Sequence, residues 1–202
     1  IEVMFDPGCP LEMPKGVKYE SNAAASKAVE IAKTADVVIY VGGISPDLEG
    51  EEMAVDADGF FGGDRTRIEL PTQQTDLLKA LHATGKPVVF VNCSGSAVAM
   101  PWETKNIPAI VQAWYPGQSG GRAVAEILFG DVNPAGRLPV TVYTSTEDLP
   151  AFEDYSMTNR TYRYFNGTPE FAFGHGLSYT HFDYATPKLE SANISASETL
   201  NL

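Results

Sequence analysis

The residues best suited to chemistry lie in one acidic run, Asp47-Leu48-Glu49-Gly50-Glu51-Glu52-Met53. Like charges that lie close together raise one another's pKa, and a carboxyl group that stays protonated near neutral pH is what a general acid requires. Two other interpretations stay open at this point. The run is also compatible with a solvated acidic loop without a role, or with a cation site built from Asp47, Glu49 and Glu51. A calcium loop would need more oxygen ligands and a closing glutamate.

Other candidate patterns are weaker. Asp64-Arg65 is best read as a local ion pair before Pro71. Gly42-Gly43 follows a predicted strand, but the rest of a dinucleotide-binding GxGxxG pattern is absent. Ser94-Gly95-Ser96 has no positioned histidine, which argues against a serine hydrolase. These patterns therefore give no reason to expect a nucleotide or a serine nucleophile.

Cysteine and histidine are scarce. Cys9 and Cys93 lie too far apart to indicate a disulfide framework, and no CxxC or HxxxH spacing occurs among them and the 3 histidines. We therefore expect both cysteines to be small buried side chains. We also expect neither a metal ion nor a cofactor.

The chain's charge and hydropathy narrow the classes of partner. Its 14 Lys and Arg against 26 Asp and Glu give a formal net charge of −12 in 202 residues. Such a chain repels phosphate backbones and anionic lipid, so nucleic acid and membranes are not expected partners. Apolar runs also fall short of the roughly 18 residues that a membrane-spanning helix needs.

The elements around the acidic run follow an alternating pattern. Continuous apolar runs at 37–41, 88–91 and 109–114 predict strands buried on both faces, as in a parallel sheet covered by helices. Helices are predicted over 22–33, with Ser21 as N-cap, from Pro71 to near Gly85, and over about 119–129. Leu77, Leu78 and Leu81 should face the core in the second helix, and Val124, Ile127 and Leu128 in the third. The fold class is therefore α/β, a layered sandwich with a mostly parallel sheet flanked by helices.

Two segments interrupt this alternation. Residues 42–70 form a loop that begins where ligand crevices lie in open α/β sheets, beyond the carboxyl end of a strand. Residues 150–184 are rich in aromatic side chains and should form an extended wrap: Phe152, Tyr155, Tyr162, Tyr164, Phe165, Phe171, Phe173, Tyr179, Phe182 and Tyr184. Residues 187–202 turn polar and predict a linker.

Four blocks in the same order resemble the second catalytic domain of glycoside hydrolase family 3. The first is Val41-Gly42-Gly43 with the acidic loop and Gly63-Asp64-Arg65. The others are 113–121 (AWYPGQSGG), 128–139 (LFGDVNPAGRLP) and Tyr162-Arg163-Tyr164 with 173–180 (FGHGLSYT). The most similar members are bacterial β-xylosidases and β-glucosidases.

This resemblance implies a retaining enzyme in which this domain supplies the acid/base glutamate to a site shared with a (β/α)8 barrel. The family's nucleophilic Asp lies in that barrel, and the 202 residues from Ile1 onward do not include one, so we expect no turnover from this chain alone. Alignment of the acidic loop favours Glu51 as the acid/base, then Glu49, then Glu52. Trp102 has two candidate roles, core packing and stacking on a sugar ring. Trp114 is expected in the core, and His175 receives no catalytic role.

The expected function is removal of terminal β-linked glucose or xylose from oligosaccharides, with retention. Residues 1–186 would form the sandwich domain, and 187–202 a linker with the beginning of a fibronectin-III-like domain. The aromatic segment is expected to pack on the barrel or on another subunit of a homo-oligomer. The resemblance favours a soluble bacterial protein, periplasmic or secreted rather than cytoplasmic. A non-catalytic carbohydrate-binding or scaffold module is the main alternative, and a nucleotide-binding flavodoxin-like domain is a weaker one.

Overall fold

A parallel sheet forms the centre of the computed structural model, which describes residues 1–17, 23–191 and 193–200. Its strands are β1 (Val38–Gly43), β4 (Val88–Cys93) and β5 (Ala109–Gln112), in the order β1-β4-β5. Val38 lies opposite Val88, and Val89 lies opposite Ala109. The predicted parallel sheet is therefore confirmed, with all its strands ending at one edge.

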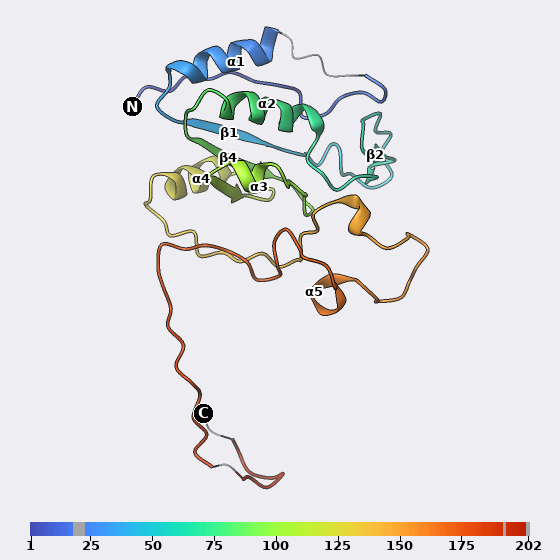
Figure 1. Cartoon of the computed structure of the whole chain (residues 1–202), viewed down its shortest axis with the longest axis vertical. Helices are drawn as coiled ribbons and strands as arrows, with labels where there is room; N and C mark the ends of the chain where they lie inside the picture. The colour runs from blue at the N-terminus through green and yellow to red at the C-terminus, as the bar shows by residue number, and fades with distance from the viewer. Residues whose placement is uncertain (18–22, 192, 201–202) are drawn as a thin grey trace.

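Helices lie on both sides of this sheet. Helices α1 (Ala23–Thr34) and α2 (Thr72–His82) cover one side, and α4 (Gly120–Leu128) lies on the other (Figure 1). A short helix, α3 (Glu103–Asn106), connects β4 to β5 and contacts α2. The three predicted helices are confirmed with small shifts of their ends. The proposed N-cap Ser21 and the first predicted helical residue, Asn22, lie outside the described residues.

The core lies between α1, α2 and the sheet. Leu77, Leu78 and Leu81 of α2 are buried as predicted, and they pack in one cluster with Val88 and Phe90 of β4. Pro71 is the N-cap of α2, where its missing N–H group is not needed by the helix. Val124, Ile127 and Leu128 of α4 are only half-buried, so the second side of the sheet is more thinly covered.

Two sequence predictions about the strands are wrong. β1 is not buried on both faces, because Ile39 and Val41 are 48% and 61% exposed at the edge of the sheet. The last strand ends at Gln112 rather than at Trp114, whose backbone turns to a φ of 55°. Trp114 is therefore half-buried beyond the strand end, not a core residue.

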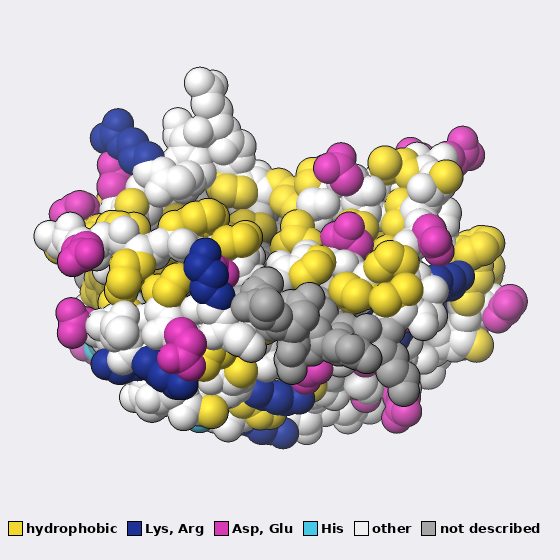
Figure 2. Space-filling model, turned by 90° about the horizontal axis from the view of Figure 1, so that it is seen from above, with side chains coloured by type: hydrophobic (Ala, Val, Ile, Leu, Met, Phe, Trp, Pro, Cys, Tyr) yellow, Lys and Arg dark blue, Asp and Glu magenta, His cyan; other side chains and the backbone are white. Residues whose placement is uncertain are grey.

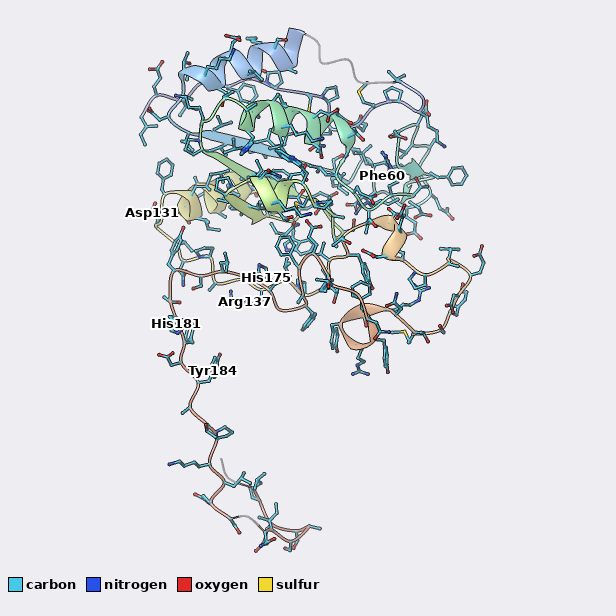
Figure 3. The ribbon with its side chains drawn as sticks, in the orientation of Figure 1. Phe60, Asp131, Arg137, His175, His181 and Tyr184 are labelled. Carbon is cyan, nitrogen blue, oxygen red and sulfur yellow. The ribbon has the colours of Figure 1, made fainter. Side chains whose placement is uncertain are left out.

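The loop after β1 contains a small antiparallel hairpin, β2 (Phe60–Phe61) and β3 (Asp64–Arg65). Phe60 is buried in the main hydrophobic cluster, and Figure 3 shows its place at the hairpin, away from the C-terminal extension. The loop is also fixed at its ends. Ile44 N–H donates to Cys93 O at 2.8 Å, and Leu70 N–H donates to Ala99 O at 2.9 Å.

The C-terminal third has little regular structure. It contains a 3-10 turn, η1 (Thr146–Asp148), a short helix, α5 (Thr161–Tyr164), and a bridge between Val142 and Phe171. The aromatic side chains that are exposed here are Phe152, Tyr155, Tyr162, Tyr164, Phe173, Tyr179, Phe182 and Tyr184. The last part of this segment extends away from the sheet, as Figure 3 shows for His181 and Tyr184. Within 187–191 and 193–200 there is no helix or strand.

The surface is mixed in character. Seen from the side of α1, hydrophobic side chains lie between acidic and basic ones (Figure 2). Among the helices of the described chain, none is long and apolar enough to cross a membrane.

Candidate functional site

A cluster of polar groups forms where the three parallel strands end. Glu49 lies in the turn after β1, Gly95 and Ser96 follow β4, and Tyr115 follows β5. The carboxyl ends of parallel strands share one edge of a sheet, and ligands of open α/β sheets bind beyond that edge. The topology therefore brings together residues that are up to 66 positions apart in the sequence.

Glu49 is the centre of this cluster. Its half-buried carboxylate accepts hydrogen bonds from Gly95 N–H at 2.8 Å, from Tyr115 Oη at 2.5 Å and from Ser96 Oγ. Gly95 and Tyr115 both reach Oε2, while Ser96 reaches Oε1. Donors on both oxygens fix the plane of the carboxylate as well as its position.

Arg65 extends the cluster from the hairpin. Its Nη1 donates to Ser96 Oγ at 2.9 Å and to Ala97 O at 2.6 Å, and its Nε donates to Arg67 O at 3.2 Å. Ser96 therefore stands between the guanidinium group and Glu49. Its hydroxyl accepts from Arg65 and donates to the carboxylate.

The surroundings shift the pKa values of two cluster members. Burial raises the pKa of Tyr115, and the hydrogen bond and negative charge of Glu49 raise it further, so its hydroxyl stays a donor at neutral pH. Burial lowers the pKa of Arg65, whereas the charges of Glu49 and Glu69 oppose that change. Because a free guanidinium titrates far above neutrality, Arg65 stays positively charged.

Buried amides support the strand ends beneath the cluster. Gln74 of α2 accepts from Gly43 N–H at 2.8 Å and donates to Gly43 O at 2.6 Å. Asn92 donates to Gln112 at 2.7 Å, and Gln112 donates to Ser94 Oγ at 3.0 Å. This network fixes the turn that presents Gly95 and Ser96 to Glu49.

Two glycines are required by close contacts. A Cβ at Gly95 would lie 2.7 Å from Tyr115 Cε2 and 2.8 Å from Glu49 Oε2. Gly63 has a φ of 88°, and a Cβ there would lie 1.7 Å from Gly50 O. The backbones of Gly50 and Gly63 thus touch and close the base of the acidic loop directly after Glu49.

The other predicted site residues lie apart from this cluster. Glu51 and Glu52 are exposed, and neither has a hydrogen bond or ion pair to another part of the described chain. Trp102 is half-buried against α2, with its ring edge-on to His82 at 5.7 Å and Lys79 Nζ 6.0 Å from the ring centroid. Of the predicted site residues, Glu49 therefore lies in the cluster at the strand ends. Glu51, Glu52 and Trp102 lie outside it.

The prediction of a local ion pair between Asp64 and Arg65 is wrong. Asp64 is exposed on β3, whereas Arg65 turns inward to Ser96 because the two residues are neighbours on a strand and point to opposite faces. The hairpin's ion pair joins Arg67 to Asp58 at 2.6 Å instead. Across the described ranges, no group of three or more His, Cys, Asp and Glu side chains could hold a metal ion.

Sequence reasoning missed Gly95, Ser96 and Tyr115 as partners of Glu49. As a local pattern, Ser94-Gly95-Ser96 suggests only a nucleophile motif, and Tyr115 belongs only to the longer block 113–121. A signal was available, because each residue follows a predicted parallel strand, and such strands end at one edge. Strand ends, rather than local motifs, identify this site.

Comparison with known proteins places these features in context. The family model described as the glycosyl hydrolase family 3 C-terminal domain matches residues 10–179. Xylan 1,4-beta-xylosidase of Xylanibacter ruminicola is 55% identical over 180 residues, which cover 89% of this chain and 21% of that protein. A periplasmic beta-glucosidase of Salmonella typhimurium is 40% identical over 185 residues, covering 85% of this chain and 23% of that protein.

Solved structures give the same result. A GH3 exo-beta-xylosidase, in complex with a xylobiose aziridine probe, has a TM-score of 0.68 and 34% identity over 84% of this chain and 22% of its own. A β-glucosidase from Erythrobacter marinus has a TM-score of 0.69 and 38% identity over 84% of this chain and 22% of its own. The chain spans about a fifth of the length of these relatives.

Proposed function

Since the chain belongs to glycoside hydrolase family 3, we propose that it supplies the acid/base residue of a retaining β-glycosidase and that this residue is Glu49. The observation that carries the proposal is the set of three donors that hold the Glu49 carboxylate at the carboxyl edge of the sheet. Glu51 and Glu52, which share the loop, point into solvent. A group that transfers a proton must be held within hydrogen-bond reach of its target, and only Glu49 is held.

The proposed reaction has two steps. Protonated Glu49 gives its proton to the glycosidic oxygen while a second carboxylate attacks the anomeric carbon, so the C–O bond to the leaving group breaks. The ionised Glu49 then takes a proton from water, whose oxygen attacks the same carbon and releases the second carboxylate. The carboxylate attacks one face of the anomeric carbon, and water later attacks the opposite face. The carbon is therefore inverted twice, and its original configuration is retained.

The second carboxylate belongs to a (β/α)8 barrel in this proposal. Retaining glycosidases place their two carboxyl groups about 5 Å apart, so the barrel must approach the carboxyl edge of the sheet. The edge is free for such an approach, since Tyr115 and Gly95 are exposed to solvent beside Glu49. The barrel and this domain would then enclose one sugar between them.

We propose terminal β-linked xylose or glucose as the sugar that is released. The relatives of known name include both xylosidases and glucosidases, with the higher identity to a xylan 1,4-beta-xylosidase. A periplasmic or secreted location suits an oligosaccharide substrate and agrees with the name of the Salmonella relative.

The test uses the complete polypeptide that carries this chain, with Glu49→Gln, Glu51→Gln and Glu52→Gln compared on phenyl β-xyloside and phenyl β-glucoside. We expect Glu49→Gln to lose about 10²–10⁴-fold in kcat/KM, as is typical for removal of a general acid, and the other two to stay close to wild type. Azide added to Glu49→Ala should attack the glycosyl-enzyme and give a β-glycosyl azide.

Each other outcome is also informative. A loss confined to Glu51→Gln would assign the role to Glu51. Unchanged kinetics in all three variants would reject an acid/base role for this loop and favour a carbohydrate-binding or scaffold module. The better of the two glycosides identifies the sugar.

A further inference from the structure

Two hydroxyl groups hold Glu49, and each reaches a defined oxygen. Tyr115 Oη donates to Oε2 at 2.5 Å, and Ser96 Oγ donates to Oε1. Gly95 N–H adds a backbone donor to Oε2 at 2.8 Å. A side-chain hydroxyl contributes to orientation only if its own proton is directed, so the surroundings of each hydroxyl decide its role.

The Ser96 proton is directed by Arg65. Arg65 Nη1 donates to Ser96 Oγ at 2.9 Å, and a guanidinium group has no acceptor. Ser96 therefore uses a lone pair for Arg65 and is left to donate its proton to Glu49. No ion pair joins Arg65 directly to Glu49 within the described part of the chain, so Ser96 provides the hydrogen-bond link between them, while their opposite charges also interact through space.

Tyr115 reaches Glu49 because of an unusual backbone at the end of β5. Trp114 has a φ of 55°, a left-handed conformation that bulky residues rarely adopt because it is strained. This turn follows directly on Ala113, whose N–H still donates to Asn92 O at 2.9 Å. The Tyr115 ring then packs on Gly95, where a Cβ would come within 2.7 Å. The strained backbone at Trp114 and the lack of a side chain at Gly95 together allow the Tyr115 hydroxyl to reach Glu49.

We propose that Tyr115 and the Ser96–Arg65 pair are positioning residues that hold the Glu49 carboxyl group in line for proton transfer to the glycosidic oxygen. This inference rests on the proposed role of Glu49. Neither hydroxyl takes up or releases a proton in the reaction. Their loss lets the carboxyl rotate, so that fewer encounters with the leaving-group oxygen are productive.

The test compares Tyr115→Phe and Ser96→Ala in the complete polypeptide on two aryl glycosides. Phenol is a poor leaving group that needs a proton, whereas 2,4-dinitrophenol leaves without one. We expect each variant to lose about tenfold in kcat/KM on the phenyl glycoside, the scale of one hydrogen bond to a charged group. On the dinitrophenyl glycoside, which reports the same bond cleavage without proton donation, the loss should be within about threefold.

Matched variants separate positioning from folding. Ser96→Thr keeps the hydroxyl and should recover most of the loss, and Tyr155→Phe removes a fully exposed hydroxyl and should change neither rate. An equal loss on both glycosides, or no loss on either, would overturn the positioning role. Glu49→Gln is the reference. If Glu49→Gln loses more activity on the phenyl than on the dinitrophenyl glycoside, but Tyr115→Phe and Ser96→Ala do not, only the positioning proposal fails. If Glu49→Gln loses activity equally on both glycosides, the proposed function of Glu49 fails as well.

Discussion

Two long segments of the chain lack extensive secondary structure, yet they are buried to very different degrees. The loop between β1 and α2 buries Leu48, Ala57 and Phe60 in the main cluster and has backbone hydrogen bonds at both ends. The 150–184 segment has ten aromatic residues, but Phe171 alone among them packs against that cluster. Aromatic content therefore does not determine burial here. The aromatic segment is joined to the fold largely by backbone hydrogen bonds, such as those of Val142 with Glu170 and Phe171, whereas the loop after β1 also buries side chains in the core.

The largest expected effect tests this contrast directly. Phe60→Ala should lower the free energy of unfolding by about 3–5 kcal/mol, because it removes a buried ring from the core. Phe152→Ala should change it by less than about 0.5 kcal/mol, since the Phe152 side chain is 90% exposed. Urea denaturation of the 202-residue chain measures both. Similar costs for the two variants would contradict the comparison.

The closed base of the acidic loop should give the next largest effect. Gly63→Ala places a Cβ 1.7 Å from Gly50 O, so the backbone beside Glu49 must move. We expect a loss of about 2–3 kcal/mol in stability, together with a fall in kcat/KM. Gly62→Ala is the control, because its φ of 59° is similar but nothing lies within 4 Å of the new Cβ.

The Gly62→Ala control isolates the backbone cost. It should lose about 1–2 kcal/mol, the penalty of a left-handed residue, and keep its activity. Equal activity in the two variants would mean that the Gly50–Gly63 contact does not hold Glu49 in place.

The smallest effect concerns the anchor of the aromatic segment. Burial raises the pKa of Glu170 to about 7, with Glu103 nearby raising it and Met100 N–H and Lys105 opposing this. A carboxyl whose pKa is higher in the folded than in the unfolded state stabilises the fold below about pH 4. That contribution is lost as the pH rises through about 7.

Amide hydrogen exchange can follow this anchor, because Met100 N–H donates to Glu170 at 2.9 Å. The protection factor of residues 100–104 should be lower at pH 8 than at pH 5.5, and Glu170→Gln should flatten the difference while keeping an acceptor for Met100. Glu153→Gln, an exposed carboxyl of the same segment, is the control. An unchanged pH dependence in Glu170→Gln would remove Glu170 as the cause.

The sequence predicts the sheet and its helices well because both produce regular patterns of apolar residues along the chain. The buried face of Leu77, Leu78 and Leu81 follows helical periodicity, and the strands follow apolar runs. The exposure of Ile39 and Val41 could not be read from their types, since burial depends on what covers a strand rather than on its own residues. The φ of Trp114 is likewise a tertiary effect of the strand end.

The sequence predicts the loop of the candidate site, and the family resemblance ranks its glutamates as Glu51, then Glu49, then Glu52. Composition and loop length identify residues 47–53, yet the preference among the three glutamates rests on donors that lie 46 to 66 positions away. Local charge gives Glu51 and Glu49 equal standing. Only the joint arrangement of three strand ends separates a held carboxylate from an exposed one.

The exposed face of β1 has a consequence for work on these 202 residues by themselves. Ile39 and Val41 lie on one face of β1, and their apolar side chains are 48% and 61% exposed. Exposed apolar side chains that lie side by side favour association with another apolar surface. We therefore expect this face to contribute to self-association at high protein concentration, and Val41→Lys should reduce it.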